Sequence, residues 1–199
     1  LDTSASMLYR SPDVEHSKWE YAAELVASLA YLLLRQQDGV GLTLADAEQR
    51  VYVPPRSRST HLTNVCEVLA GTKPGKRRTT SLARGLKHVT EVFTRKGLVF
   101  VVSDFLDTDR TWFKLARQLR SRRQEVTLLH LVDPWELTFP FEDMTIFRSL
   151  ESGREILTEP RVMREAYLRE FNRFTSELRS SAPAVGMGYR LIRTDTPTE

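Results

Sequence analysis

Apolar and polar residues follow one another along the chain in blocks that predict helices and strands in turn. Between Lys18 and Gln37, apolar residues recur at the three- and four-residue spacing of an amphipathic helix, which Asp38-Gly39 then ends. The same spacing predicts helices over residues 60–70, 82–94, 111–122 and 160–179. Short apolar runs predict strands at residues 40–44, 50–53, 98–102, 125–132 and 189–192, and Pro54-Pro55 is expected to stop the second of these strands.

This alternation predicts an α/β fold with a mainly parallel sheet flanked by helices on both faces. The run Leu98-Val99-Phe100-Val101-Val102 is typical of a strand that is covered on both sides. Residues 145–150 and 154–158, separated by Glu151-Ser152-Gly153, predict a small hairpin insertion near residues 145–158. Asp133-Pro134 is expected to break the strand before it, and the length of 199 residues suits one domain over residues 1–199.

Polar side chains stand where predicted strands end or a helix begins. Asp2-Thr3-Ser4-Ala5-Ser6 has the appearance of a strand exit, Thr80 precedes the helix at residue 82, and Asp104 follows the apolar strand. In a parallel sheet, ligands bind beyond the carboxyl ends of the strands. Residues two apart in an extended segment can point the same way. The candidate ligands are Asp2, Ser4, Ser6, Thr80 and Asp104, all hard oxygen donors of the kind that Mg²⁺ and, less selectively, Mn²⁺ or Ca²⁺ prefer.

Taken singly, each of these residues also has a structural explanation. Serine, threonine and aspartate commonly cap helices and form turns, and Thr80 is well positioned to cap the helix that follows it. Taken jointly, in this order along the chain, they favour a metal site over five separate caps.

The composition of the chain excludes several classes of protein and of metal site. The 29 Lys and Arg residues against 26 Asp and Glu residues give a net charge of +3, and 41% of residues are hydrophobic, as in ordinary globular proteins. The single Cys66 excludes an internal disulfide framework and a multi-cysteine metal site. The longest apolar stretch, Leu25 to Leu34, is too short to span a bilayer.

Catalytic motifs are weak in this sequence. The four histidines, His16, His61, His88 and His130, are scattered, and we expect them at the surface or at strand ends. No nucleophile elbow or phosphate-binding glycine loop occurs, and metal-dependent hydrolysis would need a general acid or base within reach. One cluster of basic residues could steer an acidic partner, and it consists of Lys73, Lys76, Arg77 and Arg78. A second cluster consists of Arg117, Arg120, Arg122 and Arg123. Nucleic-acid binding by these basic residues is an alternative that no recognition motif supports.

The five candidate ligands resemble a metal-ion-dependent adhesion site, in which Asp-x-Ser-x-Ser, a later Thr and a still later Asp bind one ion. They match in identity and order the site of von Willebrand factor A-type domains. The wider pattern is similar to the bacterial family called "domain of unknown function fifty-eight". It is carried by Leu1 to Met7, Lys18-Trp19-Glu20, Pro54-Pro55, Val102 to Leu106 and Asp133-Pro134-Trp135-Glu136. Thr80 is followed by Ser81 rather than Asn or Asp, and Asp104 by Phe105 rather than the Gly common in adhesion receptors.

This resemblance implies a Rossmann-like, von Willebrand factor A-like domain whose first strand is truncated at the amino terminus. It implies a non-enzymatic, divalent-metal-dependent protein–protein interaction module that holds Mg²⁺ (or Mn²⁺ or Ca²⁺). The partner would present an acidic residue, and a MoxR-type AAA+ ATPase acting in protein complex assembly or maturation is the partner that the family suggests. No small-molecule substrate or nucleic acid is expected.

The same resemblance implies a cytoplasmic location, with membrane anchoring at the cytoplasmic face through upstream sequence. Two other functions stay open: a metal-dependent hydrolase, and a scaffold with a vestigial metal site.

Overall fold

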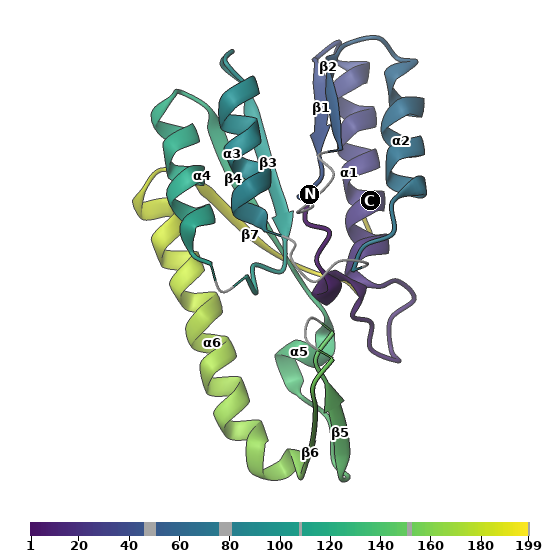
Figure 1. Ribbon diagram of the computed structural model, residues 1–199, viewed down its shortest axis with the longest axis vertical. Coiled ribbons are helices and arrows are strands. Elements are labelled where there is room, and N and C mark those ends of the chain that lie inside the picture. The colour runs from purple at the N-terminus through teal and green to yellow at the C-terminus, as the bar shows by residue number, and fades with distance from the viewer. Residues whose placement is uncertain (46–50, 76–80, 108, 151–152, 199) are drawn as a thin grey trace.

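The computed structural model describes residues 1–45, 51–75, 81–107, 109–150 and 153–198, and its helices and strands alternate along most of the chain (Figure 1). The helices are η1 (Ala5–Leu8, a 3-10 helix), α1 (Lys18–Arg35), α2 (His61–Gly71), α3 (Leu82–Val92), α4 (Thr111–Ser121), α5 (Pro134–Thr138) and α6 (Pro160–Ala184). The strands are β1 (Val40–Thr43), β2 (Tyr52–Arg56), β3 (Leu98–Ser103), β4 (Glu125–Val132), β5 (Thr145–Arg148), β6 (Glu155–Thr158) and β7 (Gly188–Arg193).

Three parallel strands form the centre of the molecule, in the order β3-β4-β7. Their register pairs Val102 of β3 with Leu129 of β4, and Leu129 with Arg190 of β7. Parallel neighbours need crossover connections. Helix α4 lies in the connection from β3 to β4, and α6 lies in the connection from β4 to β7. The expected α/β class with a parallel sheet is therefore confirmed.

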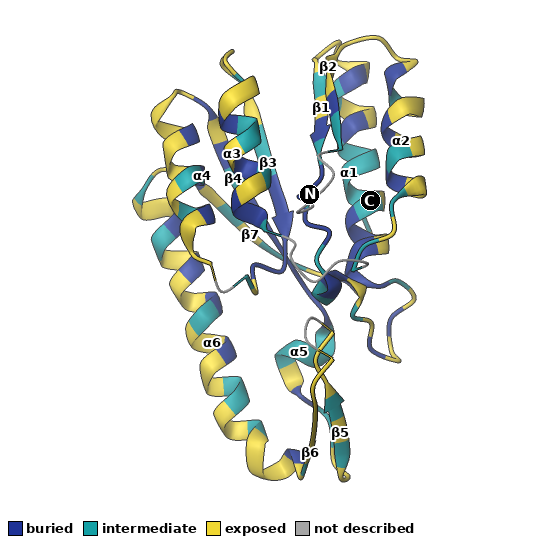
Figure 2. Cartoon of the chain, viewed as in Figure 1, coloured by how far each residue is buried: buried dark blue, intermediate teal, exposed yellow. Residues whose placement is uncertain are grey.

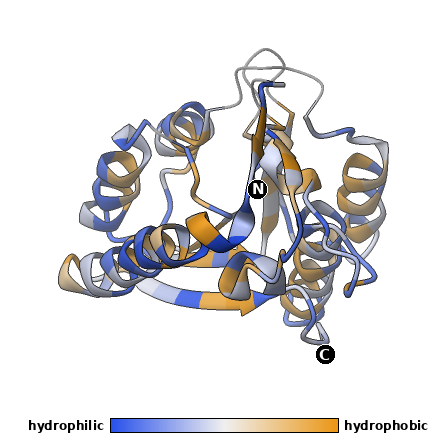
Figure 3. Cartoon of the chain, turned by 90° about the horizontal axis from the view of Figure 1, so that it is seen from below, coloured by the Kyte–Doolittle hydropathy of each residue, from blue (hydrophilic) through white to orange (hydrophobic). Residues whose placement is uncertain are grey.

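Helices cover both faces of this sheet. Successive residues of a strand point to opposite faces, so Leu128 and Leu129 of β4 belong to different apolar clusters. Leu128 lies in a cluster with buried residues of α3, α4 and α6, whereas Leu129 lies in a cluster with those of α1 and α2. The helices surround the strands, and individual helices carry both hydrophobic and hydrophilic positions (Figure 3).

The first two residues lie between the antiparallel β1–β2 pair and the parallel sheet. The backbone nitrogen of Leu1 donates to the Thr43 carbonyl at 2.9 Å, and the Ala45 N–H donates to the Leu1 carbonyl at 2.8 Å. On the other side, the Asp2 N–H donates to the Val102 carbonyl at 2.9 Å. These bonds bring Asp2 to the carboxyl end of β3. The expectation of one domain with a truncated first strand stays a prediction.

Strand β2 corrects the expected stop at Pro54-Pro55, because it continues to Arg56. It pairs with β1, and the register shifts between Val40 and Leu42, where Val40 faces Arg56 and Leu42 faces Val53. Prolines occur in sheets at edge strands and at bulges, where the missing N–H is not required for pairing. The pair Pro54-Pro55 meets this condition, since it falls at the irregular part of the ladder.

Two helices differ from expectation. Helix α5 was not expected, and it begins directly after Asp133, whose side chain caps it. Helix α6 runs past residue 179 to Ala184, with Pro160 at its start and apolar residues at helical spacing on its buried side. Within the described ranges, no helix combines the length and the apolar character that crossing a bilayer requires.

The hairpin expected near residues 145–158 is present as β5 and β6. Phe147 packs on Phe139 and Phe141, with ring centroids 5.5 and 4.9 Å apart. On the opposite face, Ile146 and Leu157 are paired across the strands and are 61% and 62% exposed. On the face of Phe147, its cross-strand partner Ile156 is also 61% exposed, so the hairpin packs mainly through Phe147, and exposed residues dominate this part of the chain (Figure 2).

Candidate metal centre

Asp2 and Asp104 lie together at the carboxyl end of β3, although 102 positions separate them in the sequence. Asp104 directly follows the last strand residue, Ser103, and the backbone bond from Asp2 to Val102 brings Asp2 to the same point. Ser103 donates its hydroxyl to Oδ2 of Asp2 at 2.5 Å, and both aspartates are almost fully buried. The structure thus brings together the two carboxylates that the sequence analysis selected.

Ser4 and Ser6 complete this cluster. The Ser4 N–H donates to Oδ1 of Asp2 at 2.9 Å, and the hydroxyls of Ser4 and Ser6 are 3.0 Å apart. The Ser6 hydroxyl also bonds to the Asp104 side chain, and against the effect of burial it adds to the larger influence of Lys18, which lowers the pKa of that carboxyl. The short helix η1 begins right after Ser4 and turns the chain so that both serines face the aspartates. Four of the five predicted ligands therefore share one hydrogen-bonded cluster.

Thr80, the fifth predicted ligand, lies outside the described residues. The described chain on either side is anchored close to the cluster. The Gly75 N–H donates to the Thr3 carbonyl at 3.0 Å, and the Leu82 N–H donates to the Asp107 carboxylate at 3.3 Å.

A buried lysine is the main feature of the site that the sequence analysis missed. Lys18 opens α1 and is 1% exposed. Its Nζ lies 2.8 Å from Oδ2 of Asp104 and 2.8 Å from Oε1 of Glu136. Lys18-Trp19-Glu20 and Asp133-Pro134-Trp135-Glu136 were both part of the family pattern, but no role was assigned to Lys18 or Glu136. A lysine at a helix start is normally exposed, so the local sequence carried no signal of this pairing.

Helix α5 fixes the position of Glu136. Asp133 accepts a hydrogen bond from the Trp135 N–H at 2.9 Å, while Glu136 accepts one from the Asp133 N–H at 2.8 Å. This reciprocal pair is a capping box. The other Asp133 oxygen accepts from the Ser11 N–H at 2.9 Å, which ties α5 to the segment after η1. The position of Glu136 is therefore fixed by this capping box as well as by its ion pair with Lys18.

The aspartates differ in their electrostatic surroundings. Burial, followed by the charge of Asp104, raises the pKa of Asp2 to about 6. Burial alone would also raise the pKa of Asp104, but the Lys18 charge and hydrogen bond outweigh it and hold that pKa below its ordinary value. Burial would lower the pKa of Lys18, and Asp104 and Glu136 instead raise it above its ordinary value. Asp104 is thus permanently ionised at neutral pH, whereas Asp2 gains a proton more easily.

Phe105 shows how the chain turns after Asp104. Its φ is 56°, in the left-handed region that favours glycine. The side chain is 1% exposed and packs on the rings of Trp112 and His130, at centroid distances of 4.8 and 5.6 Å. This apolar burial offsets the backbone strain, which typically costs about 1–3 kcal/mol.

Two histidines correct the expectation of surface or strand-end positions. His130 lies within β4 and is 1% exposed, and its Nδ1 is 2.8 Å from the hydroxyl of Tyr189. Burial lowers the pKa of His130 to about 4, so the ring is neutral at physiological pH. His61 begins α2 and is 4% exposed, with its Nε2 3.0 Å from the Val40 carbonyl. Both rings contribute to internal packing and hydrogen bonding.

The donor chemistry of the cluster fits a hard divalent cation. Asp2, Asp104, Ser4 and Ser6 offer carboxylate and hydroxyl oxygens, the ligand types of Mg²⁺ and Ca²⁺. In the part of the chain that the structure describes, no group of three or more His, Cys, Asp and Glu side chains is arranged to hold a metal ion. A cation here would therefore depend on hydroxyls and water as well as on the two carboxylates.

The chain matches the sequence model of a known family and is similar to several solved structures. The sequence model of the family described as "Protein of unknown function DUF58" matches residues 1–177. The conserved hypothetical protein BatB from Bacteroides thetaiotaomicron is similar at 19% identity and a TM-score of 0.58, covering 98% of this chain and 88% of that one. An aerotolerance-related membrane protein from Bacteroides fragilis is similar at 21% identity and a TM-score of 0.57, covering 98% and 90%. No curated protein matches the chain. At these identities the two structures show a shared fold.

Proposed function

The chain belongs to the DUF58 family, and we propose that it is a von Willebrand factor A-like module that uses a divalent cation to bind another protein. One observation carries the proposal: Asp2, Ser4, Ser6 and Asp104 come from two distant parts of the sequence and meet in a single hydrogen-bonded cluster. With Thr80, they are the residues proposed to hold the ion.

The chemistry of this cluster suits binding better than catalysis. When bound, a divalent cation supplies an electrophilic centre that can accept a carboxylate of the partner as a ligand. The chain contributes oxygen donors whose positions are fixed by Ser103 and by the backbone after Asp2 and Asp104. His130 packs nearby, but burial lowers its pKa to about 4 and its Nδ1 lies 2.8 Å from the Tyr189 hydroxyl, so the buried ring is too weak a base to serve well as a general base at neutral pH. We therefore propose a non-enzymatic role.

The partner class is taken from the resemblance. A MoxR-type AAA+ ATPase that presents an acidic side chain is the proposed partner, with a role in the assembly or maturation of protein complexes. The proposed location, at the cytoplasmic face of a membrane with anchoring through sequence outside this chain, is also taken from the resemblance. The structurally similar Bacteroides fragilis protein is described as a membrane protein, which agrees with association with a membrane.

Ion binding is tested by calorimetric titration of Mg²⁺ and Mn²⁺ into chelator-treated protein. We expect saturable binding by the wild type and its loss in Asp104→Asn and in Ser4→Ala/Ser6→Ala, each of which should stay folded by circular dichroism. A matched control is Asp13→Asn, which removes an exposed carboxylate that accepts a hydrogen bond from the Trp135 indole and is not one of the proposed ligands. Equal binding by wild type and Asp104→Asn would contradict the site.

Partner binding is tested with a purified MoxR-type ATPase. We expect complex formation in Mg²⁺ that is lost in EDTA and lost in Asp104→Asn, with the Asp13→Asn control still binding. Complex formation that is indifferent to both EDTA and Asp104→Asn would contradict a metal-dependent contact.

A further inference from the structure

The cationic end of Lys18 occupies one side of Asp104 in the candidate metal centre. Oδ2 of Asp104 pairs with Lys18 Nζ at 2.8 Å, and Oδ1 accepts the Leu106 N–H at 3.2 Å. The carboxylate is therefore held from two directions, and Ser6 adds a hydroxyl. Any ion that binds Asp104 must share it with a positive charge that the protein itself supplies.

Lys18 has no route to solvent in this arrangement. Its side chain is fully buried, and the helix that carries it is fixed at its start by a capping box between Ser17 and Glu20. Glu136 binds Lys18 from the other side and is itself held by the cap of α5. A lysine anchored in this way cannot swing away when a cation arrives without breaking two ion pairs.

We propose that Lys18 is a built-in cation of the metal centre, which holds Asp104 in place without an ion and competes with a divalent ion for the charge of that carboxylate. This inference rests on the proposed function. Two like charges attracted to one carboxylate also repel each other, and this repulsion is strong where water is excluded. Lys18 would keep ion affinity modest, and the net charge of the site would depend on it.

Removing the lysine charge should therefore strengthen ion binding. In Lys18→Met, which keeps most of the apolar stem, we expect Mn²⁺ to bind at least about tenfold more tightly than in the wild type, because one nearby positive charge is gone. Removing a negative charge should act in the opposite direction, so Glu136→Gln is expected to bind Mn²⁺ no more tightly than the wild type.

The experiment compares four chelator-treated proteins by calorimetric titration with Mn²⁺: wild type, Lys18→Met, Glu136→Gln and Lys18→Met/Glu136→Gln. Circular dichroism and the unfolding temperature establish that each is folded. Lys18→Met leaves Asp104 and Glu136 buried without their cation, so of the four proteins it is the one at greatest risk of misfolding. The double variant also removes the charge of Glu136, so that Asp104 alone is left without its cation, and its comparison with Glu136→Gln repeats the test in a background with less unpaired buried charge.

The outcomes separate this inference from the proposed function. Tighter binding on loss of Lys18, in either background, supports the inference. Equal affinity with and without Lys18 in folded proteins overturns it and leaves the metal-dependent function standing. Binding by Lys18→Met but not by the wild type supports the inference and contradicts an ion-dependent function of the native chain. Absence of binding in all four proteins overturns both.

Discussion

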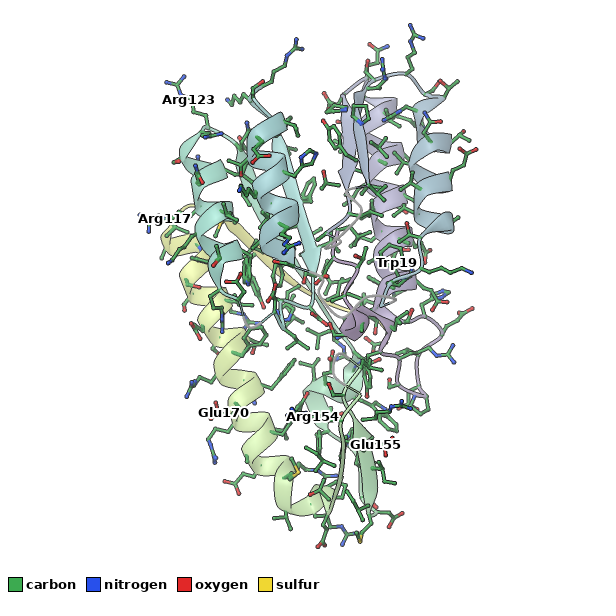
Figure 4. The ribbon with its side chains drawn as sticks, viewed as in Figure 1. Trp19, Arg117, Arg123, Arg154, Glu155 and Glu170 are labelled. Carbon is green, nitrogen blue, oxygen red and sulfur yellow. The ribbon has the colours of Figure 1, made fainter. Side chains whose placement is uncertain are left out.

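The charged side chains at one end of the parallel sheet are buried, and those at the other end are exposed. At the carboxyl end, Asp2, Asp104 and Lys18 are buried and bonded to one another or to their neighbours. At the amino end, a hollow of about 550 Å³ is lined by Lys96, Arg120, Arg123, Glu125, Val126, Thr127, Gly186 and Gly188, and its charged side chains are exposed. Arg117 lies on the outer side of α4, and Arg123 lies just beyond the end of that helix (Figure 4).

This difference shows that charge density alone does not define a site. Among the described residues, the exposed cations of the amino end make no ion pair within 4.0 Å, although Arg120 donates Nε to the Gly186 carbonyl at 2.8 Å. Exposed charges keep their water and cost little to hold or to remove. Buried charges require fixed partners, and it is those partners that give the carboxyl end a defined geometry.

The largest expected effect is the loss of the Lys18 charge. In Lys18→Met, the free energy of unfolding in chelator at pH 7 should fall by about 3–5 kcal/mol, because Asp104 and Glu136 stay buried without their cation. Urea denaturation measures this change. The double variant Lys18→Met/Glu136→Gln should recover part of it, and a loss in Lys18→Met below about 1 kcal/mol would show that the pair is solvated.

The next largest effect should be a loss of unfolding free energy in acid, caused by His130. Its pKa of about 4 in the folded protein lies below the ordinary value of 6.5, so the stability that the neutral ring contributes is present above pH 6.5 and is lost as pH falls toward 4. The loss amounts to about 3 kcal/mol. His130→Gln should show a smaller fall in unfolding free energy over this interval, whereas the control His16→Gln should keep the wild-type profile. Identical profiles for all three proteins would contradict the assignment.

Asp2 should give the unfolding free energy the opposite dependence on pH. Its pKa of about 6 lies above the ordinary 3.8, so the stability linked to its proton is fully present below pH 3.8 and is lost as pH rises through 6. In chelator at pH 7, Asp2→Asn should therefore be more stable than the wild type by about 3 kcal/mol, and the gain should vanish below pH 4. Denaturation at both pH values checks this. Lower stability of Asp2→Asn at pH 7 would show that its bonds to Ser103 and Ser4 outweigh its burial.

The smallest effect is expected at the amino end. Arg117→Ala and Arg123→Ala should each change the unfolding free energy by less than about 0.5 kcal/mol, because both side chains are exposed and outside any ion pair of the described residues. Urea denaturation at low and high salt measures this directly. A loss comparable to that of Lys18→Met would remove the contrast between the two ends.

The sequence predicted the candidate ligands better than their surroundings. Asp104 was identifiable because it follows an apolar run that predicts a strand, and the carboxyl ends of parallel strands share one edge. Asp2, Ser4 and Ser6 were identifiable from their alternating spacing and from the resemblance to an adhesion-site pattern. Lys18 was not identifiable in the same way. Its neighbours in the sequence form an ordinary capped helix start, and its two carboxylate partners lie 86 and 118 residues away.

The same distinction applies to local structure. The positions of most helices and strands followed from periodicity, whereas the continuation of β2 through Pro54-Pro55 depended on its place at the edge beside β1. The short helix α5 depended on Asp133 and Glu136 capping each other at the end of β4. The proline stop was a sound local interpretation that a neighbouring strand overrode, whereas the break expected at Asp133-Pro134 is confirmed by the end of β4 at Val132.

By itself, then, the sequence determined the order of helices and strands, the parallel sheet and the oxygen-bearing residues at its carboxyl end, because periodicity and strand ends are local properties of the chain. Only the tertiary structure decided that Lys18 is buried against Asp104 and Glu136 and that Asp2 and Asp104 have different affinities for a proton. Burial and ion pairing arise from contacts between distant segments, and both the cost of burying a charge and its compensation depend on which segments meet.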